Sequence, residues 1–316
     1  YFLESIKDIT GVFIPSIHTE NDVIKKAVIK DMENVEYPIN FVVPNTEIVQ
    51  NRISLELFRG CSRGCRFCQA GYIYRPVREK SADKLLKIAK ESIKATGLND
   101  ITLSSLSTSD YSQFQKLTTS LIDICDKDKI GLSLPSLRID TVNLDVLNKV
   151  QAVRKSSLTF APEAGSQRLR NVINKNITEE EILNGCKIAF ESGWNTVKLY
   201  FMIGLPTETF EDLSQIVTLA NKIVDLYYSL PREKRNGKCT VTVSTSTFVP
   251  KPHTPFQWFG QNTLDKIELK QQFLKDNLKN KSIKYSWHNP QVSRLEALVS
   301  RGCLLYTSPS PRDQRG

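Results

Sequence analysis

Three cysteines fall within eight consecutive positions of this chain. Cys61, Cys65 and Cys68 form a C-x3-C-x2-C pattern on one short segment. Three thiolates on one loop can hold three irons of a cubane 4Fe-4S cluster, which leaves the fourth iron open to a small molecule. Structural zinc needs a closed set of four ligands and ferredoxin-type clusters use four cysteines, whereas the nearest histidines, His18 and His253, are distant in sequence. The pattern therefore predicts a site-differentiated 4Fe-4S cluster.

Glycines and arginines surround the three cysteines. The glycines permit the tight backbone that wrapping a cluster demands; they are Gly60, Gly64 and Gly71. The arginines interleave with the cysteines and would offset the negative charge of a cluster; they are Arg59, Arg63 and Arg66. Ordinary solvated loop charge explains these arginines equally well, and both interpretations stay open.

The cysteine segment follows the first of six β-strands that the sequence predicts. From residue 53 onward, short β-branched or apolar runs alternate with stretches of helical period, which is the pattern of βα units around a parallel sheet. The expected strands are 53–58, 101–106, 130–139, 157–161, 196–203 and 240–249. The expected helices are near 81–96, 111–126, 143–153, 166–173, 179–192 and 210–229. Six units are too few for a closed eight-unit barrel, so we predict an α/β fold, an open partial (β/α)6 barrel with its site at the C-terminal ends of the strands.

The three-cysteine pattern, with the aromatic residue Phe67 before its third cysteine, resembles the radical S-adenosylmethionine (SAM) superfamily over roughly residues 50–260. The resemblance implies that SAM binds the open iron through its amino and carboxylate groups. It also implies an electron donor such as flavodoxin or ferredoxin, and reductive cleavage of SAM to a 5′-deoxyadenosyl radical that abstracts hydrogen from a substrate. We therefore expect 4Fe-4S and SAM as cofactors of an enzyme whose substrate is unidentified.

The resemblance assigns further residues to SAM. Ser105 lies at the end of the second expected strand, where the superfamily contacts the methionyl amino group, although the sequence here departs from the usual Gly-Gly-Glu type. Arg138 and Glu163 end the next two strands and are expected to pair with the carboxylate and the ribose, or each to be half of a structural salt bridge. Gly204 and Pro206 belong to a turn that resembles the G-x-P-x-E-T turn of the coproporphyrinogen oxidase, methylthiotransferase and cobalamin-linked branches.

Four short motifs most resemble an uncharacterised cobalamin-linked group of Fe-S oxidoreductases. They lie at residues 59–71, 74–78, 160–165 and 251–256. In that group a cobalamin-binding-like domain precedes the catalytic domain, so cobalamin is a candidate cofactor of an upstream domain. This sequence itself contains no D-x-H-x-x-G cobalamin motif.

Composition and charge indicate the class of protein and its cellular location. The 316 residues are 40% hydrophobic and 24% charged, ordinary values for a globular protein with a large core. No apolar run approaches the ~18 residues of a membrane span and no signal-peptide pattern occurs, so we expect a cytoplasmic protein with no membrane partner. The net charge of +9 indicates either an ordinary solvated surface or an anionic partner such as RNA. Three further cysteines, Cys125, Cys186 and Cys239, are expected in the core.

The N-terminal residues do not show the alternation of strands and helices that begins at residue 53. We expect residues 1–48 to link the barrel, residues 49–260, to an upstream domain that the sequence lacks, because the chain starts in mid-pattern and without methionine. A charged helix is expected near 21–33, between short strands or extended segments at 11–17 and 41–44.

The C-terminal residues divide into two parts. Residues 261–302 are expected to form a truncated extension with a strand at 282–287 and a helix that begins at Pro290. Residues 303–316 back-translate to a transposase sequencing adapter, so we expect them to be an artefact rather than part of the fold.

Two other functions compete with a radical SAM enzyme of unknown substrate. The first is a methylthiotransferase that acts on tRNA or a ribosomal protein, which the branch resemblance and the positive charge favour. The second is a basic nucleic-acid-binding module in which the three cysteines hold zinc with a remote fourth ligand. The chain lacks the clustered aromatic and basic residues of such a module.

Overall fold

The computed structural model describes residues 1–19, 21–133 and 158–301 of the chain. The chain forms two compact units, Tyr1–Glu36 and Tyr37–Gly316. The first unit contains one helix, α1 (Phe2–Ile6), and turns. The helix expected near 21–33 is wrong, because the described residues there are irregular. Several β-branched valines and isoleucines lower the helix propensity of that segment.

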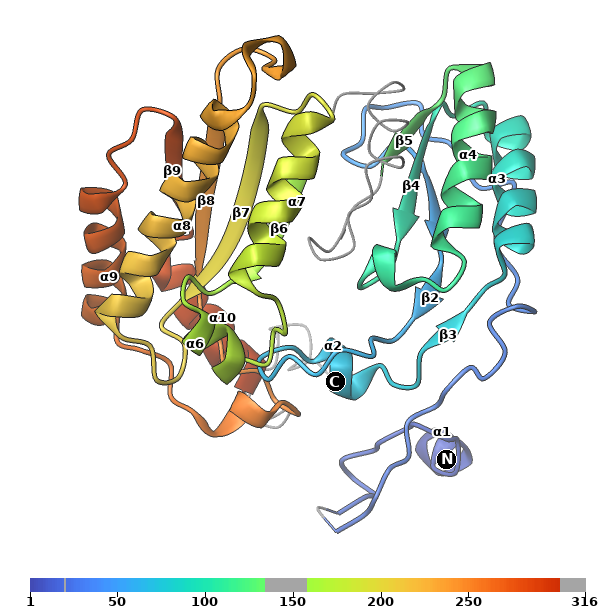
Figure 1. The fold of residues 1–316 in the computed structure, drawn as a ribbon. Helices are drawn as coiled ribbons and strands as arrows, with labels where there is room; N and C mark the ends of the chain where they lie inside the picture. Colours follow the sequence, from blue (N-terminus) through green and yellow to red (C-terminus); the bar gives the residue numbers. More distant parts are fainter. Residues whose placement is uncertain (20, 134–157, 302–316) are drawn as a thin grey trace. The chain divides into compact units, whose positions relative to one another are not determined.

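The second unit begins with a three-stranded parallel sheet. Its strands follow the order β1-β4-β5, with register pairs such as Leu55 with Leu103. The strands are β1 (Ile53–Glu56), β4 (Asp100–Ser104) and β5 (Gly131–Ser133). Two helices pack side by side over this sheet (Figure 1), namely α3 (Ala82–Thr96) and α4 (Phe114–Asp128). The fully buried Leu55 and Leu103 show that the core lies between the strands and these helices.

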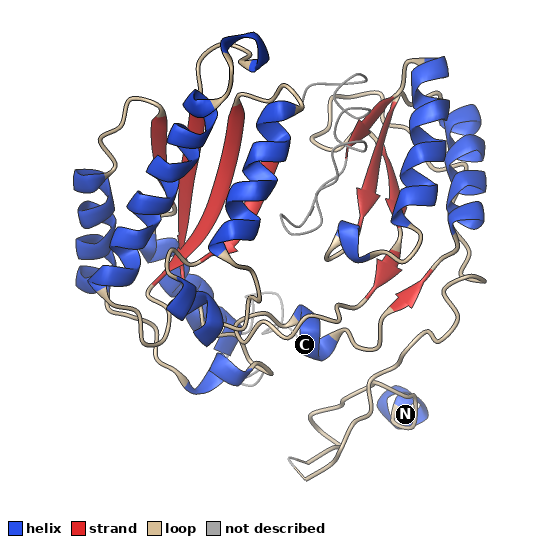
Figure 2. Cartoon of the chain, viewed as in Figure 1, coloured by secondary structure: helices blue, strands red, loops and turns tan. Residues whose placement is uncertain are grey.

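A four-stranded parallel sheet forms the second half of this unit. Its order is β6-β7-β8-β9. The strands are β6 (Leu158–Glu163), β7 (Thr196–Ile203), β8 (Thr240–Thr247) and β9 (Ile283–Trp287). The helices α7 (Glu179–Glu191), α8 (Phe210–Ser229) and α9 (Leu264–Asn277) follow one another along the sheet (Figure 2). Because β9 pairs in parallel with β8, the sheet continues past residue 260.

The fold is therefore α/β with parallel sheets, as predicted. Among the described residues no strand joins the two sheets into a closed barrel, and the segment between β5 and β6, with the helix expected near 143–153, lies outside those residues. The first expected strand divides in two: β1 ends at Glu56, and β2 (Phe58–Arg59) pairs antiparallel with β3 (Arg78–Glu79). The short segments 11–17 and 41–44 form no strand.

Short elements follow the strands at their C-terminal ends. They are α2 (Ala70–Ile73), the 3-10 turn η1 (Thr108–Asp110), α6 (Gln167–Val172), η4 (Pro255–Trp258) and α10 (Pro290–Arg301). A further 3-10 turn, η3 (Arg232–Lys234), lies between α8 and β8.

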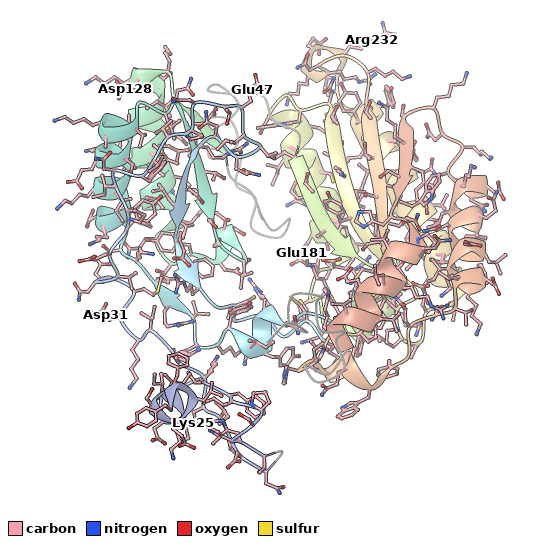
Figure 3. All side chains as sticks on the ribbon, turned by 180° about the vertical axis from the view of Figure 1, so that it is seen from behind. Lys25, Asp31, Glu47, Asp128, Glu181 and Arg232 are labelled. Carbon is pink, nitrogen blue, oxygen red and sulfur yellow. The ribbon has the colours of Figure 1, made fainter. Side chains whose placement is uncertain are left out.

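Capping boxes fix the starts of two long helices. The Thr178 hydroxyl accepts from the Glu181 N–H at 3.1 Å, and the Glu181 carboxylate accepts from the Thr178 N–H at 2.7 Å. Glu181 is labelled at the first turn of α7 in Figure 3. Thr209 and Asp212 form the same motif at the start of α8. These two starts confirm the helix boundaries that the sequence predicts.

Candidate functional site

The cysteine loop, residues 60–69, runs between β2 and α2. Cys65 is buried, and Cys61 and Cys68 are half-buried. Gly60 has φ +99°, and a Cβ there would lie 2.6 Å from the Tyr74 carbonyl oxygen. A Cβ on Gly71 would lie 2.1 Å from the Arg63 carbonyl oxygen. Only glycine fits either position, because the loop folds back against the backbone that follows it.

The end of β4 holds the cysteine loop through an ion pair. The Arg63 guanidinium donates to both carboxylate oxygens of Asp110, at 2.9 Å from Nε and 2.5 Å from Nη2. Asp110 is the last residue of η1, which follows β4. This bidentate geometry is the strongest that arginine makes with a carboxylate.

The segment after β6 contacts the same loop through several hydrogen bonds. The Arg66 N–H donates to the Ile173 carbonyl at 3.0 Å, and its guanidinium donates to the Val172 carbonyl at 2.5 Å. The Asn174 amide donates to the Gly64 carbonyl at 2.8 Å. These contacts join the loop to the C-terminal side of α6.

The segment after β8 provides a third attachment. The Gln69 amide donates to the Pro252 carbonyl at 3.0 Å, and the Phe256 N–H donates to the Arg66 carbonyl at 3.2 Å. Loops that follow β4, β6 and β8 therefore meet the cysteine loop, which is where a site at the C-terminal ends of the strands was predicted.

Phe67 packs into a small apolar cluster that these loops share. The half-buried ring lies against a group of buried side chains: Ala164, Leu169, Ile173, Leu205, Phe248 and Phe256. The cluster draws on the segments after β6, β7 and β8. Its packing explains why an aromatic residue stands before the third cysteine, and a contact between Phe67 and SAM stays a prediction.

Glu163 ends β6 in a conformation that is unusual for its residue type. Its φ is +68°, in the left-handed region that disfavours side chains other than glycine and asparagine. The Lys175 ammonium lies 3.1 Å from its carboxylate, and both side chains are largely buried. The salt bridge considered for Glu163 is therefore present. Strain of this kind is typical of functional sites.

Lys175 is not among the site residues predicted from the sequence. It lies between Asn174 and Asn176, which have φ values of +55° and +51°. The Asn-Lys-Asn sequence indicates a turn, but only the tertiary structure brings the ammonium to Glu163.

Two more residues, Ser105 and Arg138, are predicted to contact SAM. Ser105 directly follows β4, and its hydroxyl shares a 3.0 Å hydrogen bond with the Thr108 hydroxyl. Arg138 lies outside the described residues. A role of Ser105 toward the methionyl amino group stays a prediction.

The turn after β7 is anchored on α9. The Gly204 N–H donates to the Glu208 carboxylate at 2.8 Å, and the Lys270 ammonium lies 2.6 Å from the same oxygen. Burial raises the pKa of Glu208 and outweighs the opposing charge of Lys270. Pro206 is buried within the turn. The turn is therefore a rigid support, and contacts of Gly204 and Pro206 with SAM stay predictions.

A buried arginine stiffens the segment after β6. Arg170 is fully buried, and its guanidinium donates to the carbonyls of Ala164, Gly165 and Ile177 at 3.0, 2.7 and 3.1 Å. Burial lowers the pKa of Arg170. These bonds fix the two residues that follow Glu163, and so the direction in which β6 ends.

Three cysteines on one loop match the number of protein ligands of a site-differentiated 4Fe-4S cluster, and ligation by these cysteines stays a prediction. Within residues 1–19, 21–133 and 158–301, no three His, Cys, Asp or Glu side chains are grouped so that they could hold a metal ion. The three loop cysteines nevertheless lie on one tightly held backbone, with Cys61 and Cys68 partly exposed. The other three are buried, and burial raises the pKa of Cys125 and Cys239 to about 11 and that of Cys186 further. Those thiols are core residues, as expected.

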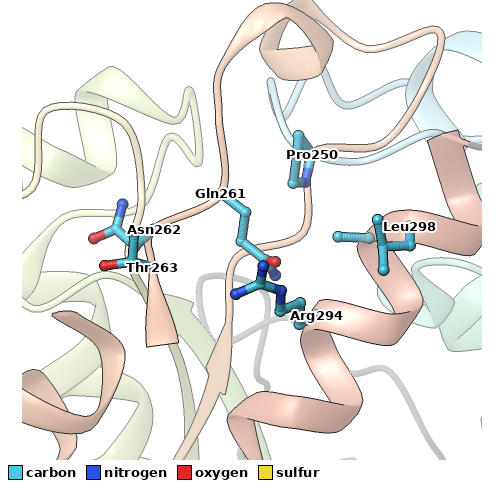
Figure 4. A pocket seen from close by; sticks show the side chains of 7 residues that line it. Pro250, Gln261, Asn262, Thr263, Arg294 and Leu298 are labelled. Atoms are coloured by element: carbon cyan, nitrogen blue, oxygen red, sulfur yellow. The ribbon is translucent and has the colours of Figure 1, made fainter. Parts of the chain in front are cut away.

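A cavity of about 510 Å³ opens between the segment after β8 and α10 (Figure 4). Its lining includes Pro250, Gln261, Asn262, Thr263, Arg294, Ala297 and Leu298. None of the predicted site residues lines it, so the cavity does not define the candidate site. In the described part of the chain, no helix has the length and apolar character needed to cross a membrane.

Comparison with known proteins identifies the family. Residues 55–220 match the model of the radical SAM superfamily. An uncharacterized protein of Methanocaldococcus jannaschii is 34% identical over 295 residues, which cover 93% of this chain and 62% of that protein. The tRNA-2-methylthio-N(6)-dimethylallyladenosine synthase of Clostridium beijerinckii is 22% identical over 233 residues, or 71% of this chain and 50% of that enzyme. The chain thus spans about half to three fifths of the length of these two relatives.

Solved structures of low identity share part of the chain trace. The radical SAM methyltransferase TsrM of Kitasatospora setae, solved with cobalamin and a [4Fe-4S] cluster, is 13% identical, with a TM-score of 0.49 over 65% of this chain and 38% of that one. Methylornithine synthase is 15% identical, with a TM-score of 0.47 over 78% of this chain and 68% of that one. Similarity at this level does not indicate what this chain binds. The family match covers more than half of the sequence, and the chain belongs to the radical SAM superfamily, whose enzymes use a 4Fe-4S cluster and SAM.

Proposed function

We propose that this chain is the catalytic part of an enzyme that reductively cleaves SAM to a 5′-deoxyadenosyl radical, which abstracts hydrogen from a substrate still to be identified. Cys61, Cys65 and Cys68 hold the 4Fe-4S cluster in this proposal. The observation that carries it is the attachment of the three-cysteine loop to the segments that follow β4, β6 and β8. The loop itself lies inside the residues that match the family.

When bound, the cluster supplies the electron for cleavage, delivered to it by a donor such as flavodoxin or ferredoxin. The chain's own residues bind and orient SAM. Ser105 faces the methionyl amino group and Glu163 the ribose hydroxyls in this proposal, with the Lys175 salt bridge holding the Glu163 carboxylate in place. Arg138 pairs with the SAM carboxylate. Cobalamin and a cytoplasmic location stay predictions.

Three further residues shape the site around SAM. Phe67, Gly204 and Pro206 line it in this proposal. Support comes from the apolar cluster around Phe67, which includes Leu205 of the turn between the other two. Apolar packing of this kind excludes water from a site in which a reactive radical forms.

Metal analysis of the purified protein after anaerobic reconstitution tests the cluster. The wild type should contain iron and acid-labile sulfide in 4Fe-4S proportion, and Cys65→Ala should lose most of both. Cys125→Ala is the matched control, because Cys125 is buried in the core of the first sheet and should not change iron content. Stoichiometric zinc without sulfide in the wild type would contradict the proposal and support the zinc-binding module instead.

A methylthiotransferase acting on tRNA is the second candidate. A specific observation favours it, since the Clostridium beijerinckii relative carries the name of a tRNA methylthiolating enzyme. Transfer of a methylthio group to RNA would show as a mass increase of a nucleoside after incubation with bulk tRNA, SAM, sulfide and a reductant. Unchanged nucleosides alongside active SAM cleavage would remove this candidate.

A further inference from the structure

Arg63 occupies the centre of the cysteine loop, two residues after Cys61 and two before Cys65. The Nε and Nη2 atoms of its guanidinium both donate to the Asp110 carboxylate, whereas the hydrogen bonds that join the loop to the segments after β6 and β8 end on backbone carbonyls. The Asp110 side chain is only 15% exposed and that of Arg63 35%. A bidentate pair fixes direction as well as distance, so this contact can orient the loop rather than merely tether it.

Asp110 is in turn fixed to the segment that carries Ser105. The Asp110 N–H donates to the Ser107 carbonyl at 2.9 Å within η1. Thr108, the first residue of η1, is fully buried and shares its hydroxyl hydrogen bond with Ser105. Tyr111 follows η1, is 2% exposed, and donates from its hydroxyl to the Lys80 carbonyl at 2.7 Å. The turn is therefore anchored in the core of the first sheet.

We propose that Asp110 is a positioning residue that, through Arg63, sets the cysteine loop at a fixed distance from Ser105. The inference rests on the proposed function, because it concerns the alignment of the cluster ligands with the group that faces the SAM amino nitrogen. An error of about 1 Å in such an alignment can reduce a rate about 100-fold.

Asp110→Asn tests the inference. The substitution keeps the size of the side chain but turns one accepting oxygen into an NH2 group that faces the guanidinium. Asp110→Glu keeps the carboxylate and should restore part of the function. Asp83→Asn is the matched control, because Asp83 pairs with Lys116 on the surface of α3 and α4, with side chains 76% and 54% exposed.

Two readouts on reconstituted protein separate positioning from folding. The first is the change that SAM causes in the electron paramagnetic resonance spectrum of the reduced cluster. The second is the rate of 5′-deoxyadenosine formation at saturating SAM. Asp110→Asn should retain the iron content and the SAM-free spectrum of the wild type, need about tenfold more SAM for the spectral change, and form product about 100-fold more slowly.

The alternative outcomes are distinct. If the Asp110→Asn variant gives the same two readouts as the wild type and the Asp83→Asn control, the inference is overturned. Loss of iron from Asp110→Asn would also overturn it, since the pair would then be a folding contact. A wild type whose cluster neither responds to SAM nor cleaves it would instead contradict the proposed function.

Discussion

Asp212 offers a test of the electrostatics that hold the segment after β6 to α8. Its carboxylate caps α8 and accepts from the Arg168 guanidinium and, at 2.5 Å, from the Ser166 hydroxyl. Burial alone would raise the pKa of Asp212, but the hydrogen bonds from Arg168, Ser166 and Thr209 outweigh burial and lower the pKa from 3.8 to about 2. At ~1.4 kcal/mol per pKa unit, the ionised carboxylate stabilises the fold by about 2 kcal/mol.

The lowered pKa of Asp212 sets how this stabilisation changes with pH. The stabilisation is fully present above pH 4, where the unfolded carboxyl is ionised, and it is lost as the pH falls toward 2. Asp212→Asn should therefore reduce the free energy of unfolding by about 2 kcal/mol at pH 7, and the difference from the wild type should shrink as the pH approaches 2.

Urea unfolding of iron-free protein at several pH values between 7 and 2 measures this difference without a contribution from cluster loss. Asp126→Asn is the control, because Asp126 is exposed and pairs only weakly with Lys129. A difference between Asp212→Asn and the wild type that stays constant over the whole pH range would show that ionisation of Asp212 does not stabilise the fold.

Two other substitutions test the packing around the site. Gly71→Ala should destabilise the fold by about 3 kcal/mol and lower iron loading, because its Cβ would collide with the Arg63 carbonyl. Gly260→Ala is the control, because a Cβ there meets nothing within 4 Å. This control should match the wild type in iron content and thermal unfolding. Lys270→Met should cost about 3–5 kcal/mol at pH 7, because it leaves the buried Glu208 carboxylate without an opposite charge. A loss below 1 kcal/mol in urea unfolding would argue against a stabilising ion pair.

Local patterns were enough to predict much of the second unit. The strand expected at 196–203 matches β7, and the capping residues Thr178 and Thr209 start the helices that follow them. These features depend on residues that are neighbours in sequence, where side-chain period and caps act directly. The helix expected near 21–33 failed because its β-branched residues satisfy the apolar pattern without favouring helix.

The contacts that hold the candidate site together join residues that are distant in sequence. Arg63 and Asp110 are 47 positions apart, and Asn174 lies 110 positions from Gly64. No local period indicates such pairs, because they arise only when loops from different strands meet. The three cysteines could be found from spacing alone, whereas the residues that position them required the tertiary structure.

The amount of 5′-deoxyadenosine formed from SAM by anaerobically reconstituted, dithionite-reduced protein tests most directly whether the three loop cysteines hold a cluster that cleaves SAM. The wild type and Cys125→Ala should form it, and Cys61→Ala, Cys65→Ala and Cys68→Ala should form none. A wild-type protein with a full 4Fe-4S cluster that forms no 5′-deoxyadenosine would contradict the account.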